Sequence, residues 1–306
     1  MTRLREAADE YVTMRRRMGF KFEEGAELLA DFVQHVEASG ATAINTANAL
    51  SWAQCSGKHP NWWAKRLSIV RGFANYVSGL EPGHQVPPRG LIPTQSHRAT
   101  PYLYSERDVV RLMVSARALR SASWALTTET AIGLLAATGM RVGELVSLDV
   151  SDVDWDQGLL TVRSSKFGKS RLVPLHPSTV AALRYYDASR RRRQITSETS
   201  AFFVSMTGER LRYDSLHRTF HRLVRQLALR TTAGKLPRVH DLRHTFAVST
   251  LLGWYRSGLD VAARLHLLSA YLGHIDPAAT YWYLSAAPEL LALVAERLEP
   301  PEGTPS

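Results

Sequence analysis

Apolar residues recur at helical spacing over most of the chain, which predicts a protein built mainly from helices. One repeat near the amino terminus consists of Phe22, Ala26, Leu29, Val33 and Val36. A second repeat runs through residues 64–77. An apolar position every three or four residues forms a stripe along one side of a helix. Residues 1–80 are therefore expected to form a small helical bundle.

A stretch rich in proline and glycine follows this region. It contains Pro82, Gly83, Pro87, Pro88, Gly90 and Pro93. Proline has no backbone N–H and clashes with preceding carbonyls, so such a stretch cannot continue a helix. Residues 81–104 are predicted to be an interdomain linker, residues 105–298 a second domain, and residues 299–306 a disordered tail.

The second domain combines helical patterns with one short alternating stretch. Ser105 and Asp108 have the spacing of a capping box, which predicts a helix start. A helix over 129–147 is expected to break near Gly139, and strands over 159–162 and 171–175 to form a hairpin with Lys166 at its bend. Pro288 opens a last expected helix, 288–298. The predicted fold is mainly α with a small antiparallel sheet.

The charge favours a polyanionic partner. The net charge is +10; residues 1–80 carry ten Lys and Arg against eight Asp and Glu, which leaves a net +8 for residues 81–306. Lysine and arginine bound to phosphates release condensed counterions. Cys55 is the single cysteine, which excludes an intramolecular disulfide and a multi-cysteine zinc site. The sequence has neither a run of 18 apolar residues nor a signal-peptide pattern, so a cytoplasmic protein is expected.

Four separate segments carry cationic, imidazole or phenolic side chains. The first is Thr-Gly-Met-Arg141-Val-Gly-Glu144, and the second contains Lys166 and Lys169. The third is His240-Asp-Leu-Arg243-His, and the fourth places His274 nine positions before Tyr283. These residue types suit cleavage of a phosphodiester.

Cleavage without a metal needs positive charge on the two non-bridging oxygens, an in-line nucleophile and a proton for the leaving oxygen. Arg141 and Arg243 suit the first task, since a guanidinium donates two parallel hydrogen bonds to a phosphate. Lys166 is the candidate general acid. His240 shares a helix face with Arg243 at a spacing of three. Tyr283 is the candidate nucleophile.

A phenol has a pKa of about 10, so nearby positive charge and an imidazole acceptor are needed to make it reactive. Tyr281 is a competitor in the same aromatic stretch. His274 and Tyr283 are nine positions apart, which is too far for adjacent helix turns, so a short loop through Asp276-Pro277 is expected to bring the tyrosine back.

These segments, in this order, resemble the tyrosine recombinase (phage integrase) family over about residues 105–298. The resemblance implies a helical core-binding domain joined to a catalytic domain, with a site formed by Arg141, Lys166, His240, Arg243, His274 and Tyr283. It also implies a 3′-phosphotyrosyl intermediate, with Glu144 orienting an arginine or His240. Double-stranded DNA is the implied partner. A homo-tetramer on two sites, exchange of helix 288–298 between protomers, accessory proteins and a nucleoid location are further implications, and no metal or ATP is expected.

The helical first domain has a candidate DNA-facing surface of its own. Trp62 and Trp63 lie beside Lys65, Arg66 and Arg71. The alternative is that the indoles pack in the core and their cations are solvated. Lys169 in the second domain is a further candidate DNA contact.

Two other functions remain open at this point. His240 and His244 are one helical turn apart, which is the spacing of zinc ligands in metal-dependent hydrolases. A catalytically silent DNA-binding protein of the same fold is the other alternative. The connection from Arg243 to His274 also looks long for the family, and its extra residues, around Gly253–Gly258, are expected in a loop after a helix through Phe246 and Leu251.

Overall fold

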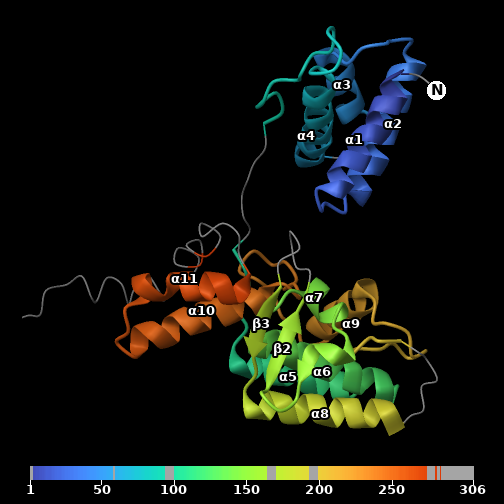
Figure 1. Ribbon diagram of the computed structural model, residues 1–306. Coiled ribbons are helices and arrows are strands. Elements are labelled where there is room, and N and C mark those ends of the chain that lie inside the picture. Colours follow the sequence, from blue (N-terminus) through green and yellow to red (C-terminus); the bar gives the residue numbers. More distant parts are fainter. Residues whose placement is uncertain are drawn as a thin grey trace, which may run out of the picture. The chain divides into compact units, whose positions relative to one another are not determined.

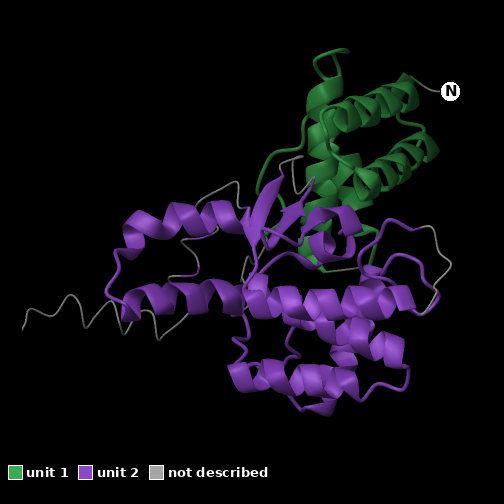
Figure 2. Cartoon of the chain, turned by 60° about the horizontal axis from the view of Figure 1, so that its bottom comes forward, with its two compact units in different colours: residues 1–98 green, residues 99–306 purple. Residues whose placement is uncertain are grey.

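The computed structural model describes residues 3–57, 59–93, 100–163, 170–192, 199–273, 280 and 283. The chain divides into two compact units, residues 1–98 and 99–306 (Figure 2). Each unit has a hydrophobic core of its own.

Unit 1 is a helical bundle, as the periodicity predicted (Figure 1). Its described helices are α1 (Arg3–Arg17), α2 (Glu23–Ala38), α3 (Thr46–Gln54) and α4 (Pro60–Val77). The side chain of Asn45 accepts from the backbone N–H of Asn48 and so caps the start of α3. Pro60 lies in the first turn of α4, where its missing N–H costs nothing. Phe32, Trp52 and Phe73 fill the core.

The proline-rich stretch predicted as a linker packs on unit 1 over its first dozen residues. Arg71 donates to the carbonyls of Pro87 (2.8 Å) and Pro88 (2.9 Å). The backbone N–H of Gln85 donates to Ile44 O, and Ile92 is 8% exposed within the unit 1 core. A proline has a backbone carbonyl that accepts hydrogen bonds but no N–H that donates one. The guanidinium of Arg71 supplies donors to two of these carbonyls.

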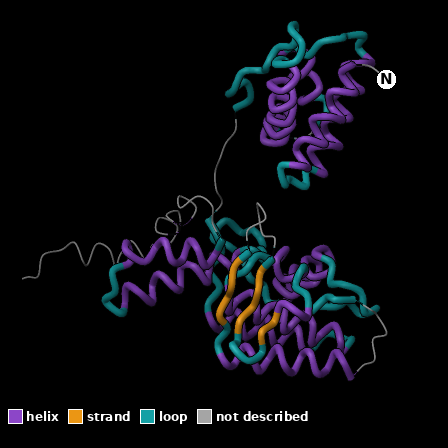
Figure 3. The backbone as a smooth tube through the Cα atoms, in the orientation of Figure 1, coloured by secondary structure: helices purple, strands orange, loops and turns teal. Residues whose placement is uncertain are grey.

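Unit 2 is mainly helical with a small sheet (Figure 3). In its described part the helices are α5 (Glu106–Arg117), α6 (Ala122–Thr138), α7 (Val142–Val146), the 3-10 turn η1 (Val150–Asp152), α8 (Pro177–Arg192), α9 (Tyr213–Gln226), α10 (Asp241–Arg256) and α11 (Val261–Leu272). Helix α6 is apolar around most of its circumference, which is typical of a buried helix. It packs against α5, α8, α9 and α10.

The strands β1 (Val153–Asp154), β2 (Leu159–Val162) and β3 (Arg171–Pro174) form an antiparallel sheet in that order. The predicted hairpin is confirmed, with Val162 opposite Arg171. Strand β1 was not predicted, because two residues are too few for an alternating pattern. The mainly helical fold class with a small antiparallel sheet is confirmed.

The helix boundaries follow the predicted signals with one exception. Ser105 and Asp108 form the expected capping box of α5. Helix α6 ends at Gly139, which has a positive φ of 60°, as the predicted break requires. The exception is α10, which continues to Arg256, so Gly253 and the three residues after it are helical rather than in a loop. Apolar packing of α10 against α11 extends the helix through these residues.

Candidate active site

Arg141 lies immediately before α7 and is held by Glu144, three residues along. The backbone N–H of Arg141 donates to Glu144 Oε2 (2.9 Å), and Nη1 donates to Oε1 (2.8 Å). A carboxylate in the first helical turn is the usual partner for the exposed N–H groups there. The side chain of Arg141 is therefore fixed at two points by one carboxylate.

A third residue, Arg171 on β3, joins this pair. Its Nη1 and Nη2 donate to the two oxygens of Glu144 at 3.0 and 2.8 Å, which is a bidentate pairing. Sequence reasoning missed Arg171, because it appears there only as the first residue of a strand. The carboxylate of Glu144 thus accepts four hydrogen bonds, two on each oxygen.

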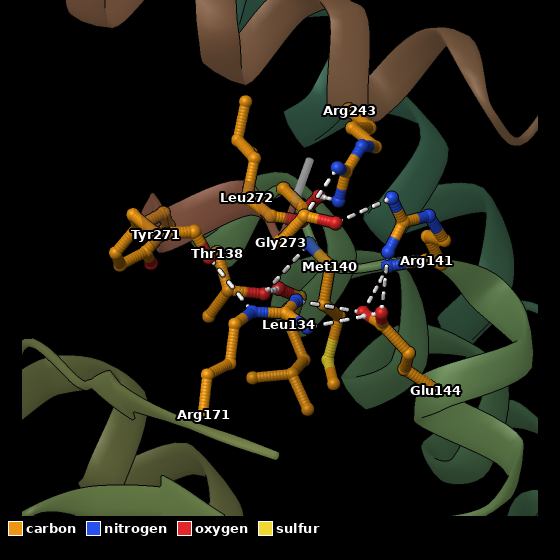
Figure 4. A network of polar contacts seen from close by, with 11 residues as sticks. Leu134, Thr138, Met140, Arg141, Glu144, Arg171, Arg243, Tyr271, Leu272 and Gly273 are labelled. Atoms are coloured by element: carbon orange, nitrogen blue, oxygen red, sulfur yellow. Dashed lines mark hydrogen bonds and ion pairs between the residues drawn. The ribbon is translucent and has the colours of Figure 1, made fainter. Parts of the chain in front are cut away.

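The end of α11 receives a guanidinium at each of three consecutive carbonyls (Figure 4). Arg171 Nε donates to Tyr271 O at 2.7 Å, Arg243 Nη2 to Leu272 O at 2.7 Å and Arg141 Nη2 to Gly273 O at 3.1 Å. The last carbonyls of a helix lack intrahelical partners and carry partial negative charge. The structure therefore brings the two predicted clamp arginines together, from separate segments, at the residue before His274.

Two glycines make this approach possible. Gly139 ends α6 and its carbonyl accepts from Arg243 Nη1 (2.9 Å). Gly273 ends α11 with φ of 67°, and a Cβ there would meet Arg171 Nη1 at 3.0 Å. A Cβ on Gly139 would meet the Phe246 ring at 2.5 Å. Both positions need a left-handed conformation and close approach, which glycine alone supplies without strain.

The cluster is strongly electropositive, with three guanidiniums around one carboxylate. Burial alone would raise the pKa of Glu144, but the hydrogen bonds from Arg171 and Arg141 lower it to about 2. Burial, and then the charge of Arg141, lowers the pKa of Arg243 to about 10. Arg243 therefore remains charged at neutral pH although its exposed fraction is 2%.

His240 precedes α10, and Arg243 lies in the first turn of that helix. Burial disfavours the charged imidazolium and, together with the positive charges of Arg243 and Arg238, lowers the pKa of His240 below its ordinary 6.5. The His240 and His244 rings meet edge to face with centroids 4.8 Å apart, and the His244 and Tyr283 rings lie 5.5 Å apart. The lowered pKa favours the neutral form of His240, and the His244 ring contacts both the His240 ring and the Tyr283 ring.

Tyr283 belongs to a hydrophobic cluster with α10 and α11. It is 2% exposed and lies among residues that include Val248, Leu251 and Leu268. The negative charge that Tyr283 can carry acts on Arg243 and favours its protonated form. The predicted nucleophile is thus beside the arginine cluster, and its ring is covered by protein.

Several predicted features lie outside the described residues. These are Lys166, Lys169, His274, Tyr281, the helix 288–298 and the tail 299–306. Described strands flank the first two, and His274 directly follows Gly273.

In unit 1 the predicted DNA-contacting cations have protein partners. Arg66 pairs with Asp31 at 3.0 Å, stacks 3.8 Å from the Trp52 ring centre and has a side chain 8% exposed. Arg71 is bound to the proline carbonyls described above. These contacts hold both arginines against unit 1, and a DNA contact by either residue stays a prediction. Lys65 pairs with Glu24 (2.6 Å) but remains exposed.

No group of three or more His, Cys, Asp or Glu that could hold a metal occurs among the described residues. His240 and His244 therefore lack a third ligand within that part of the chain. None of the helices described is long and apolar enough to span a membrane.

Comparison with known proteins identifies the class. The sequence model of the phage integrase family matches residues 104–289. The chain belongs to the phage integrase family, whose members are tyrosine recombinases.

Individual relatives match most of the chain. It is 44% identical to a putative integrase/recombinase, y4rB, of Sinorhizobium fredii, over 98% of both chains. It is 28% identical to the tyrosine recombinase XerC of Chromobacterium violaceum, over 90% of this chain and 86% of the relative. Among solved structures, the Tn1549 transposon integrase in complex with transposon right end DNA aligns with a TM-score of 0.69 over 97% of this chain and 99% of that one. Its 16% identity makes this a likeness of fold.

Proposed function

We propose that this chain is a site-specific DNA recombinase that cuts and rejoins strands through a 3′-phosphotyrosine at Tyr283, without metal or ATP. The observation that carries the proposal is the convergence of Arg141 and Arg243 at the end of α11, beside Tyr283. Membership of the phage integrase family supports the same chemistry.

The two arginines form the clamp on the scissile phosphate. Each guanidinium has five N–H groups, and the bonds to carbonyls and carboxylate described above use two in each. The remaining donors suit the non-bridging oxygens, where charge develops in the transition state. Because protein contacts already fix both side chains, little reorganisation is needed when DNA arrives.

The bond changes balance without a cofactor. The phenolic oxygen of Tyr283 attacks phosphorus, the bond from phosphorus to the 5′ oxygen breaks, and Lys166 supplies the proton to that oxygen. The phenolic proton passes to an imidazole, for which neutral His240 is suited by its lowered pKa. Attack by a 5′ hydroxyl on the phosphotyrosine reverses these steps and rejoins a strand.

The test uses DNA nicked near the cleavage position, so that the cut fragment diffuses away and the covalent adduct accumulates. We expect an adduct in excess chelator, its loss in Tyr283→Phe and its retention in Tyr281→Phe. Cleavage that stops in chelator would instead indicate the hydrolase that uses His240 and His244. DNA binding with no adduct from the unmodified protein would indicate a catalytically silent binder.

Double-stranded DNA is the proposed partner, and the nucleoid the proposed location. The net charge of +8 over residues 81–306 supports this, as does the DNA in the Tn1549 integrase structure. Binding should weaken steeply with added salt, since each neutralised phosphate releases counterions. In unit 1 Lys65 is the exposed candidate contact, and Lys169 is the candidate in unit 2.

We also propose a homo-tetramer on two DNA sites, in which helix 288–298 passes to a neighbouring protomer. Unit 2 has a largely apolar groove of about 1180 Å³ whose lining includes Val110, Met113, Leu126 and Phe246. The apolar positions of 288–298 match such a surface in character. Deleting residues 288–306 should reduce the tetramer on paired sites to smaller species in sedimentation, with single-site binding retained. An unchanged tetramer would contradict this exchange.

A further inference from the structure

Arg171 belongs to the network of hydrogen bonds around Glu144 and the end of α11, but the sequence patterns did not single it out. It begins β3, opposite Val162, and its side chain is 12% exposed. Three of its N–H groups are bound, two by Glu144 and one by the Tyr271 carbonyl. The side chain therefore connects the sheet to both the Arg141 carboxylate partner and the end of α11.

Arg171 also affects the net charge around Glu144, which gives it a function beyond packing. A carboxylate bound only to Arg141 would neutralise much of the positive charge that a phosphate needs. With Arg171 bidentate on the same carboxylate, the charge of Glu144 is divided between two cations, and the cluster keeps a net positive charge. Arg171 also binds both oxygens of Glu144, which fixes the carboxylate that accepts from Arg141.

The second contact fixes the other partner of Arg141. Arg171 Nε binds Tyr271 O, two residues before Gly273, whose carbonyl accepts from Arg141. A guanidinium held between a carboxylate and a carbonyl keeps its orientation only if both partners are fixed. Arg171 contacts Glu144 directly and reaches the Gly273 end of α11 through the Tyr271 carbonyl.

We propose that Arg171 is a positioning residue for strand cleavage: through Glu144 and the Tyr271 carbonyl it sets the orientation of Arg141 and preserves the positive charge of the clamp. This rests on the proposed recombinase function. It predicts an effect on the transition state, where Arg141 acts, and little effect on DNA affinity, which is distributed over many phosphate contacts.

The experiment measures single-turnover adduct formation at saturating DNA, together with DNA affinity and thermal stability. Arg171→Met keeps an unbranched apolar stem but removes the charge and the guanidinium fork, and it should slow cleavage about 10²-fold, as expected for a misplaced catalytic group. Arg171→Lys restores the charge but not the fork, so its rate should lie between those of Arg171→Met and the unmodified protein.

Arg190→Met is the matched control. Arg190 is 14% exposed and likewise binds one carboxylate, of Asp187, and one carbonyl, of Ala201, away from the site. It should lose stability as Arg171→Met does but cleave at the normal rate once folded. Equal slowing in both variants would reduce Arg171 to a structural role and overturn the proposal.

A second substrate separates positioning from general loss of structure. In a methylphosphonate, a methyl group replaces one non-bridging oxygen, so the linkage is neutral. Its cleavage therefore needs less stabilisation by the positive charge of Arg141 and Arg243. The defect of Arg171→Met should shrink at least several-fold on this DNA. A defect of the same size on both substrates, or Arg171→Lys at the full rate, contradicts the proposal. An unmodified protein that binds DNA without forming an adduct overturns the recombinase function itself, and this role with it.

Discussion

Replacing Glu144 with glutamine should destabilise unit 2 in a pH-dependent way. The side chain is 6% exposed, and its carboxylate accepts four hydrogen bonds from Arg141 and Arg171. Glutamine has the same shape but one acceptor oxygen, and its amide group would point N–H donors at guanidinium donors. Removing one partner from a buried ionic group costs about 3–5 kcal/mol. For a unit of this size that corresponds to a Tm lowered by roughly 6–20 °C.

The pKa of Glu144 sets the pH range of the effect. Its fall from the ordinary 4.5 to about 2 corresponds to about 3 kcal/mol of stability at neutral pH. A carboxyl whose pKa is lowered by folding contributes fully above its unfolded pKa, and the contribution is lost as the pH falls through the folded value. The difference between the two proteins should therefore be constant above pH 5 and shrink by about 3 kcal/mol as the pH approaches 2.

The assay is urea denaturation followed by circular dichroism at several pH values, with the transition of unit 2 compared between variants. Glu129→Gln is the control, since Glu129 pairs with the exposed Arg117 and should cost at most about 1 kcal/mol. A Glu144→Gln penalty below 1 kcal/mol at pH 7, or one independent of pH, would refute the reasoning.

Three further predictions concern other parts of the site. Arg243→Lys cannot bind two carbonyls as a fork, so single-turnover cleavage should fall about 10²-fold or more while gel-shift affinity changes little; equal losses in both would contradict the clamp. Gly139→Ala forces a side chain into positive φ against Phe246 and should cost about 1–3 kcal/mol in a denaturation experiment, whereas an unchanged midpoint would contradict the close packing. Lys166→Ala should slow cleavage about 10²–10⁴-fold on normal DNA. The same variant should cleave at nearly the full rate when sulfur replaces the leaving 5′ oxygen, because a thiolate leaves without a proton; no rescue would assign the proton to another group.

Local signals predicted the elements that local interactions determine. The capping box at Ser105 and the helix break at Gly139 depend on side chains within a few residues, and both are present. The extent of α10 was not predictable in this way, because glycine at 253 suggests an end that packing against α11 overrides.

Residues of the candidate site could be predicted where the residue type suits a definite role in phosphodiester cleavage. Arg141 and Arg243 were identified and do converge. Arg171 was not, because an arginine at a strand start is common and its partners, Glu144 and the Tyr271 carbonyl, are distant in sequence. The same limitation affected unit 1, because the partners of Arg66, which are the Trp52 ring and the Asp31 carboxylate, are also distant from it in sequence.

The central claim is that the oxygen of Tyr283 becomes bonded to DNA. It is tested most directly by trapping the adduct in chelator, trimming the DNA with nuclease and sequencing the modified peptide by mass spectrometry. A nucleotide joined through its 3′ phosphate to Tyr283 is the predicted result. The same modification on Tyr281, or a cut strand with no modified tyrosine, would contradict the account.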